Sequence, residues 1–185
     1  MTDDERLINL LAERSTKRGQ FTLASGRKSE YYIDARLTTM SPEGLSLIGR
    51  LALSKLRQSG WTVDSVGGLT LGADPISYAI SYASAESRSP VRAFTVRKEA
   101  KSHGTGRTIE GPFTKSDRVA VIEDVITTGG SALRAIEAVR AEQGTVVGVL
   151  ALVDREEGGR QAIEAVGVPV ISMVKASQII HALGG

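Results

Sequence analysis

The apolar residues near the N-terminus recur every three or four positions, which is the spacing of one face of a helix. Leu7, Leu10 and Leu11 carry this pattern within the stretch MTDDERLINLLAERSTKRG. We therefore predict a first helix over about residues 3–18. Gly19 should end it, because glycine is common just after the last turn of a helix.

Turn-forming residues then interrupt the helical pattern. Two short extended segments are expected near residues 20–23 and 30–33, separated by the turn-like Ser25-Gly26-Arg27. A second helix should begin after Ser41-Pro42-Glu43, which supplies a cap, a proline and an acid in the order that a helix start favours, and should run to about Gln58. The first 40 residues thus predict a small hood of helix and hairpin.

From residue 60 onward, short apolar runs alternate with segments of helical period. The runs predict strands at 63–66, 91–96, 118–122, 145–153 and 168–173, and the segments between them predict helices at 74–83, 131–142 and 158–165. Such alternation is typical of a parallel sheet with helices on both faces. We predict one α/β domain over residues 1–185, whose core at 60–175 is a Rossmann-like parallel sheet flanked by helices. Ligands of such sheets bind beyond the carboxyl ends of the strands.

One stretch, residues 97–116, breaks this alternation and reads as a long loop. Loops of this length inside a compact domain are usually functional or disordered. Four cations face one anion, Glu99, between residues 97 and 107, so the local charge is 4 − 1 = +3. The cations are Arg97, Lys98, Lys101 and Arg107.

Composition narrows the functional classes. With 41% apolar and 24% charged residues the chain reads as a globular protein, and the absence of cysteine excludes disulfides, thiolate metal sites and a cysteine nucleophile. The N-terminus lacks the basic region of a signal peptide, and no apolar run approaches the ~20 residues of a membrane span. A net charge of +2 and 4% aromatics give little support to nucleic-acid binding. We expect a cytoplasmic protein with neither nucleic acid nor membrane as partner.

The richest candidate chemistry lies at residues 119–139, VAVIEDVITTGGSALRAIEAV. Two hydroxyls, two glycines and a helix start converge in TTGGS, which suits an anion such as phosphate. The alternative is an ordinary strand-to-helix turn capped by Ser131. Glu123 and Asp124 would repel an isolated phosphate, unless the ligand also offers a vicinal diol to the carboxylates or brings a magnesium ion. A ribose 5-phosphate has this layout, whereas the alternative leaves one acid as a solvated strand-end residue.

This combination resembles the signature of the type I phosphoribosyltransferase family, in which paired acids end a strand and a Thr/Gly-rich loop follows. The resemblance implies that Glu123 and Asp124 bind the ribose hydroxyls of phosphoribosyl pyrophosphate and that the loop holds its 5-phosphate. It also implies Mg²⁺, held mainly by the substrate near Asp124. The implied residues of this segment are Glu123, Asp124, Val125, Ile126, Thr127, Thr128, Gly129, Gly130 and Ser131.

Four further segments, in the same order along the chain, are similar to the orotate phosphoribosyltransferases within that family. FTLASGRKSEYYID at 21–34 resembles their N-terminal hairpin, and GGLTLGADP at 67–75 resembles a loop after a strand. VRKEAKSHGTGRTIEG at 96–111 resembles their mobile catalytic loop, and LVDREEGG at 152–159 their base-recognition segment. The implied reaction joins orotate to phosphoribosyl pyrophosphate, giving orotidine 5′-monophosphate and pyrophosphate in pyrimidine biosynthesis.

The same resemblance implies roles for residues outside the acidic motif. Arg155, helped by Thr127, would grip the orotate carboxylate, and the aromatic pair Tyr31 and Tyr32 would line the base. Lys101, His103 and Asp124 are the implied catalytic residues. The implied pyrophosphate contacts are Arg97, Lys98, Lys101 and His103. The loop at 97–112 would complete the site of the neighbouring subunit in a homodimer.

Alternatives and departures remain at this point. Taken alone, Arg155 favours a surface ion pair to Glu156 or Glu157, and only the resemblance reverses that interpretation. The fold alone is also consistent with transfer to another base or with a non-catalytic nucleic-acid regulator. Ala24 and Gly72 stand where some family members carry a lysine. His181 has no chemical context and is expected to be structural or exposed.

Overall fold

The computed structural model of the protein describes residues 1–22, 26, 28–99 and 108–184. Predictions made for Ala24, Arg27, Lys101, His103 and Arg107 fall outside the described residues. Within the described residues, no helix is both long and apolar enough to cross a membrane.

A six-stranded sheet forms the centre of the protein, with strand order β5-β4-β3-β6-β7-β8. All neighbouring strands run parallel except β5, which pairs antiparallel with β4. The strands are β3 (Ser65–Leu69), β4 (Arg92–Val96), β5 (Ile109–Glu110), β6 (Arg118–Ile126), β7 (Thr145–Asp154) and β8 (Val170–Lys175). The predicted Rossmann-like α/β fold is confirmed.

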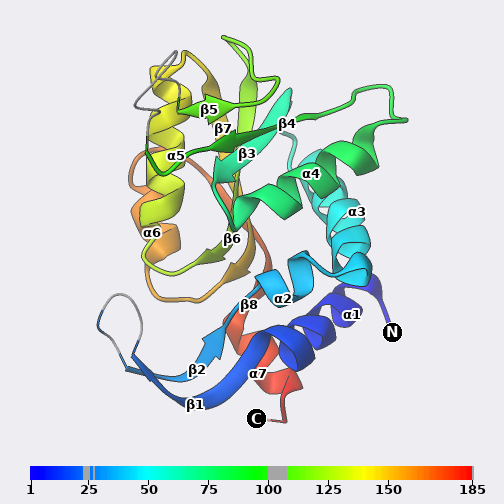
Figure 1. The fold of residues 1–185 in the computed structure, drawn as a ribbon, viewed down its shortest axis with the longest axis vertical. Helices are drawn as coiled ribbons and strands as arrows, with labels where there is room; N and C mark the ends of the chain where they lie inside the picture. The colour runs from blue at the N-terminus through cyan, green and yellow to red at the C-terminus, as the bar shows by residue number, and fades with distance from the viewer. Residues whose placement is uncertain (23–25, 27, 100–107, 185) are drawn as a thin grey trace.

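Helices cover both faces of this sheet (Figure 1). Successive side chains of a strand point to opposite faces of the sheet, so alternate residues pack against the helices on opposite faces. Ala120 and Ile122 of β6 pack into the cluster that includes α3 (Pro42–Gln58) and α4 (Ala73–Ser84). Val119 and Val121 pack instead against α5 (Gly130–Ala141) and α6 (Gly159–Glu164).

The N-terminal segment forms a second, two-stranded sheet at one end of the molecule (Figure 1). It is an antiparallel hairpin of β1 (Thr16–Thr22) and β2 (Lys28–Ile33). The short helix α2 (Arg36–Thr39) follows the hairpin, and α7 (Ala176–Ala182) ends the described chain. Neither helix was predicted, because each is too short to show a clear helical period.

The first helix is shorter than predicted. α1 spans Asp3–Leu10 and continues only as a π-helical turn, Leu11–Ser15. Thr16 is already extended, pairs across the hairpin with Ile33 and donates its hydroxyl to the Leu11 carbonyl. Gly19 therefore lies inside β1 instead of ending a helix, because strand pairing overrides the local pattern.

Three other boundaries also differ from the prediction. β3 continues past its predicted end at residue 66 and includes Gly67 and Gly68, and the loop at 97–116 contains the two-residue strand β5. β6 continues four residues beyond its predicted end, so its carboxyl end carries both acids inside the strand.

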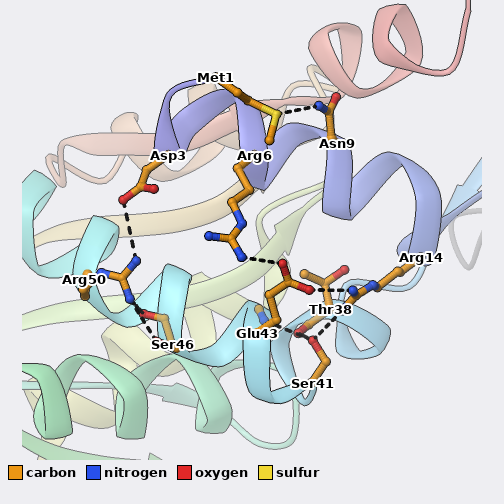
Figure 2. A network of polar contacts seen from close by, with 11 residues as sticks. Met1, Asp3, Arg6, Asn9, Arg14, Thr38, Ser41, Glu43, Ser46 and Arg50 are labelled. Carbon is orange, nitrogen blue, oxygen red and sulfur yellow. Dashed lines mark hydrogen bonds and ion pairs between the residues drawn. The ribbon is translucent and has the colours of Figure 1, made fainter.

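Ion pairs fasten the N-terminal helix to α3 (Figure 2). Glu43 accepts hydrogen bonds from Arg6 and Arg14, each at 2.6 Å, and Ser41 caps α3 by accepting from the Gly44 amide. Exposed pairs of this kind contribute little individually, on the order of 0–1 kcal/mol. Together they fix the position of the hood relative to α3, so that the end of β2 and α2 lie beside the sheet.

Candidate active site at the carboxyl edge of the sheet

The paired acids of β6 point to different faces because they are consecutive strand residues. Glu123 is on the α5 side and is only 8% exposed. Burial raises the pKa of the Glu123 carboxyl well above its usual range, and the neighbouring Asp124 charge raises it further, whereas Arg134 opposes the shift. The fold therefore makes ionisation of the Glu123 carboxyl costly.

Asp124 faces the loop between β3 and α4. Its Oδ1 accepts a hydrogen bond from the Val125 amide at 2.8 Å, and its carboxylate lies directly against Gly72. A Cβ at position 72 would collide with the carboxylate, so glycine is required for this approach. Gly72 stands where some family members carry a lysine. In this chain the Asp124 carboxylate occupies the space that a side chain at position 72 would need.

A buried carboxylate holds that loop in place. Asp74, at the start of α4, accepts hydrogen bonds from the hydroxyls of Thr70 at 2.7 Å and Thr95 at 2.9 Å. The Thr95 hydroxyl also pairs with Tyr78 at 2.7 Å. Asp74 therefore links the ends of β3 and β4, and through Gly72 it supports Asp124.

The TTGGS segment turns sharply into α5. Gly129 adopts a left-handed φ of 84° and is the residue that precedes the helix, which begins at Gly130. No side chain caps this helix start, so the expected alternative of a cap by Ser131 is wrong. The first-turn N–H groups of α5 are left without a side-chain acceptor, and such groups, with the helix dipole, favour an anion.

Arg155 joins the end of β7 to the hairpin. It is 4% exposed, and its Nε donates to Glu157 at 2.8 Å while Nη2 donates to Ser29 at 3.2 Å. Its guanidinium lies 4.6 Å from the centre of the Tyr31 ring. The ion pair with Glu157 that the sequence suggested is therefore present. It is buried and oriented by contacts with the hairpin, so it is not a surface ion pair.

A cavity of about 480 Å³, here named the carboxyl-edge cavity, gathers most of these groups. It brings together six predicted site residues from β2, β6, the TTGGS segment and the end of β7 with a previously unconsidered pair at the junction of β2 and α2. The lining residues are Tyr32, Ile33, Asp34, Ala35, Arg36, Asp124, Val125, Thr127, Thr128 and Arg155.

Other predicted residues lie outside this lining. Tyr31 packs under Arg155, whereas Tyr32, which does line the cavity, contacts Phe21 with ring centres 5.7 Å apart. Arg97 pairs with Glu110 at 3.5 Å, and neither it nor Lys98 lines the cavity. The predicted Lys101 and His103 lie outside the described residues.

Sequence reasoning missed the pair Asp34 and Arg36. Asp34 accepts from Arg36 Nε at 2.8 Å and Nη2 at 2.9 Å, and these hydrogen bonds lower the pKa of the Asp34 carboxyl despite some burial. The only signal was an acid and an arginine two residues apart, directly after a predicted strand.

Within the described part of the chain, no group of three or more acids or histidines is placed to hold a metal ion. Glu123 and Asp124 supply hard oxygen donors of the kind that Mg²⁺ prefers, and Asp124 lines the cavity. The two carboxylates suit Mg²⁺ only if a ligand provides most of the remaining oxygens.

Comparison with known proteins adds to this geometry. No protein-family model matches the chain. A curated orotate phosphoribosyltransferase of Aquifex aeolicus is 46% identical over 183 residues, covering 97% of this chain and 99% of the relative. One from Rhodopseudomonas palustris is 44% identical over 180 residues, covering 95% of each. The crystal structure of the Mycobacterium tuberculosis H37Rv enzyme in complex with 5-phospho-α-D-ribosyl 1-diphosphate (PRPP) superposes with a TM-score of 0.81 at 42% identity, covering 96% of this chain and 99% of that one.

Proposed function

This chain belongs to the orotate phosphoribosyltransferase family, and from that membership we propose how the residues of the carboxyl-edge cavity share the two substrates. The reaction of the family is transfer of ribose 5-phosphate from PRPP to orotate, which gives orotidine 5′-monophosphate and pyrophosphate. The chain is accordingly a pentosyltransferase of pyrimidine biosynthesis. We propose that it acts in the cytoplasm as one domain, with the hood at 1–40 over the core at 60–175.

PRPP is assigned to the end of β6 and the turn that follows. The observation that carries this assignment is the uncapped start of α5, which follows directly after Thr127 and Thr128, two residues that line the same cavity as Asp124. The 5-phosphate accepts hydrogen bonds from the N–H groups and hydroxyls of residues 127–131. Asp124 accepts from a ribose hydroxyl, and Glu123 is the second proposed acceptor. The backbone of Val125 and Ile126 completes this side.

Magnesium is proposed as the cofactor, since phosphoribosyltransferases that use PRPP generally require it. PRPP oxygens would hold most of its coordination sphere, and Asp124 is the nearest protein donor in our assignment. When bound, the ion offsets the charge that develops on the leaving pyrophosphate.

Orotate is assigned to the opposite side of the cavity, next to Arg155. Glu157, Ser29 and Tyr31 already orient this guanidinium, so little entropy is lost when it pairs with the orotate carboxylate. Thr127 and Tyr32 line the cavity beside it and complete the proposed base site.

The proposed mechanism relies on position and charge more than on covalent help. The bond from C1 of the ribose to pyrophosphate loosens, the sugar becomes oxocarbenium-like, and an orotate ring nitrogen forms the new bond to C1 from the opposite face. The loop residues Arg97, Lys98, Lys101 and His103 are proposed to contact the pyrophosphate, and His103 to protonate it as it leaves. Closure of the loop at 97–112 would exclude water.

A base-competition assay tests the assigned activity. Orotate, uracil and adenine are supplied together with PRPP and Mg²⁺, and each nucleotide product is quantified. We expect orotidine 5′-monophosphate as the main product, because only orotate offers a carboxylate to Arg155. Transfer to adenine without transfer to orotate would reject the assignment.

We also propose a homodimer. Large apolar side chains stay exposed on or beside α2, in the loop after β3 and on α4, with Tyr82 as much as 86% exposed. They are Leu37, Met40, Leu71, Tyr78 and Tyr82. An apolar surface of this kind favours association with another subunit.

Mixed dimers test whether the loop acts on the neighbouring subunit. A Lys101→Ala chain and an Arg155→Ala chain, each inactive alone, are mixed after mild dissociation. Sharing of the loop predicts recovery of about a quarter of wild-type activity, because statistical mixing leaves some sites with both residues intact. No recovery in verified mixed dimers would contradict the proposal.

A further inference from the structure

We propose that Arg36, clamped by Asp34, contacts the pyrophosphate group of PRPP. This inference rests on the proposed function and adds a residue that the sequence motifs do not indicate. The two residues lie at the junction of β2 and α2, on the hood, and both line the carboxyl-edge cavity together with Asp124, Thr127 and Thr128.

Arg36 also reaches a second hollow. This neighbouring space of about 440 Å³ is lined by Asp34, Arg36 and residues of α2, and on its far side by Leu71. Arg36 therefore stands between the PRPP cavity and the loop that follows β3. Asp124 is close enough for its charge to help raise the Arg36 pKa, after the larger effect of the Asp34 hydrogen bond.

The Asp34 clamp leaves part of the guanidinium available. Asp34 engages Nε and Nη2 of Arg36, and its Oδ1 also accepts from the Arg36 amide at 3.2 Å. Within the described ranges, Nη1 donates to no acceptor, and the side chain is 48% exposed. A planar fork fixed on one side presents its remaining N–H groups in a set direction, which lowers the entropy cost of binding an anion.

The layout of PRPP decides which anion this is. The 5-phosphate and the pyrophosphate are attached at opposite ends of the ribose, and the diol lies between them. With the 5-phosphate on residues 127–131 and the diol at Asp124, C1 points away from the TTGGS segment, toward Leu71 and Arg36. Arg155 does not line the hollow that contains Leu71, and is assigned to the base.

Charge supports the same assignment. Among the described residues that line the carboxyl-edge cavity, Arg36 and Arg155 are the cations. Arg155 is buried and paired with Glu157, and the loop Thr70-Leu71-Gly72-Ala73 carries no charged side chain. Of the two cations in this lining, Arg36 is therefore the one left to meet the negative charge which develops on the leaving oxygens.

The test is steady-state kinetics in both directions with Arg36→Gln. Loss of a charge-assisted hydrogen bond to the leaving group predicts a fall in kcat/KM for PRPP of about 10–100-fold. In the reverse reaction, the KM for pyrophosphate should rise by about tenfold, while the KM for orotidine 5′-monophosphate stays within about twofold. Asp34→Asn leaves the Arg36 charge in place but weakens the hydrogen bonds that orient its guanidinium. A smaller rise of about threefold in the pyrophosphate KM is therefore expected.

Arg118→Gln is the matched control. Arg118 is also 48% exposed and also donates through Nε and Nη2 to one aspartate, Asp64, but it begins β6 at the amino end of the sheet. Its kinetic constants should equal those of the wild type. An Arg36→Gln variant with unchanged pyrophosphate KM, or with the main loss in the constants for orotate and orotidine 5′-monophosphate, would overturn the proposal. Absence of orotate turnover in the wild type would instead reject the proposed function.

Discussion

The acids at the amino end of the sheet differ in their pairing from the two adjacent acids at the carboxyl end of β6. At the amino end, Asp64 is paired with Arg118 at 2.7 Å, and the buried Asp117 is paired with Arg92 at 2.6 Å. At the carboxyl end, Glu123 and Asp124 form no ion pair with any described residue.

In the proposed assignment, this difference separates acids that contribute to stability from acids that bind the substrate. A paired acid has its charge compensated in the folded protein, and removing one partner is costly. The adjacent acids of β6 repel each other, and one of them is buried, so holding both ionised carries an electrostatic cost. A substrate that brings hydroxyl donors and a divalent cation would relieve that cost.

The largest expected effect comes from comparing Arg155, at the carboxyl end of the sheet, with Arg92, at the amino end. Arg155→Gln should lower kcat/KM for orotate by about 10²–10³-fold, because a buried, oriented cation that meets the substrate is lost. Arg92→Gln at the amino end should leave kinetics unchanged but lower the free energy of unfolding by about 1–3 kcal/mol, since Asp117 loses its partner. Steady-state assays and urea unfolding of both variants provide the measurement, and equal kinetic losses would erase the distinction.

An intermediate effect is expected from two close-packed glycines. Gly72→Ala should displace the Asp124 carboxylate and raise the KM for PRPP by about tenfold. Gly148 of β7 packs instead on the Trp61 ring, so Gly148→Ala should cost about 1–3 kcal/mol of stability through overpacking and leave this KM unchanged. A normal PRPP KM in Gly72→Ala would show that the Asp124 position does not matter.

The smallest effect is the dependence of stability on pH. The Asp64 pKa is lowered to about 2, chiefly by hydrogen bonds from Arg118, so its contribution is present above pH 3.8 and is lost as pH falls toward 2. Because the pair is mostly exposed, the loss should stay below about 1 kcal/mol. The raised Glu123 pKa acts in the opposite sense: its contribution is full below pH 4.5 and is lost as pH rises through the folded value.

Unfolding at several pH values separates these two contributions. Glu123→Gln should become more stable relative to the wild type as pH rises from 4 to 8, and Asp64→Asn should become less stable relative to the wild type as pH rises from 2 to 5. Parallel stability curves for the wild type and Glu123→Gln would contradict the assigned cost of burying that acid.

Signals that are local in sequence predicted structure well. α3 begins and ends where the Ser-Pro-Glu cap and the apolar period indicate, and the α/β alternation gave the fold class. α1 was overextended, because the pairing of Thr16 with Ile33 is a contact across the hairpin that no local pattern reports. The TTGGS segment with Glu123 and Asp124 was predicted because its signal is also local: the whole motif lies within nine residues.

Contacts between distant segments could not be found in this way. The packing of Gly72 against Asp124 joins residues 52 positions apart, since 124 − 72 = 52, and the pattern showed only that an expected side chain was missing. Arg36 gave no signal of its own, because its relevance depends on the hood bringing α2 beside the end of β6. Only the folded arrangement identifies it as a neighbour of the proposed PRPP site.

The most direct test of this account is a paired measurement on Asp124→Asn and Asp64→Asn. Calorimetry gives the Kd for PRPP with Mg²⁺, and urea unfolding gives the stability of the free protein. Asp124→Asn should weaken PRPP binding by about 10–100-fold without loss of stability, because it removes a ligand contact and a repulsion on Glu123. Asp64→Asn should be less stable and bind PRPP normally. The account is contradicted if Asp124→Asn is destabilised and binds PRPP as the wild type does.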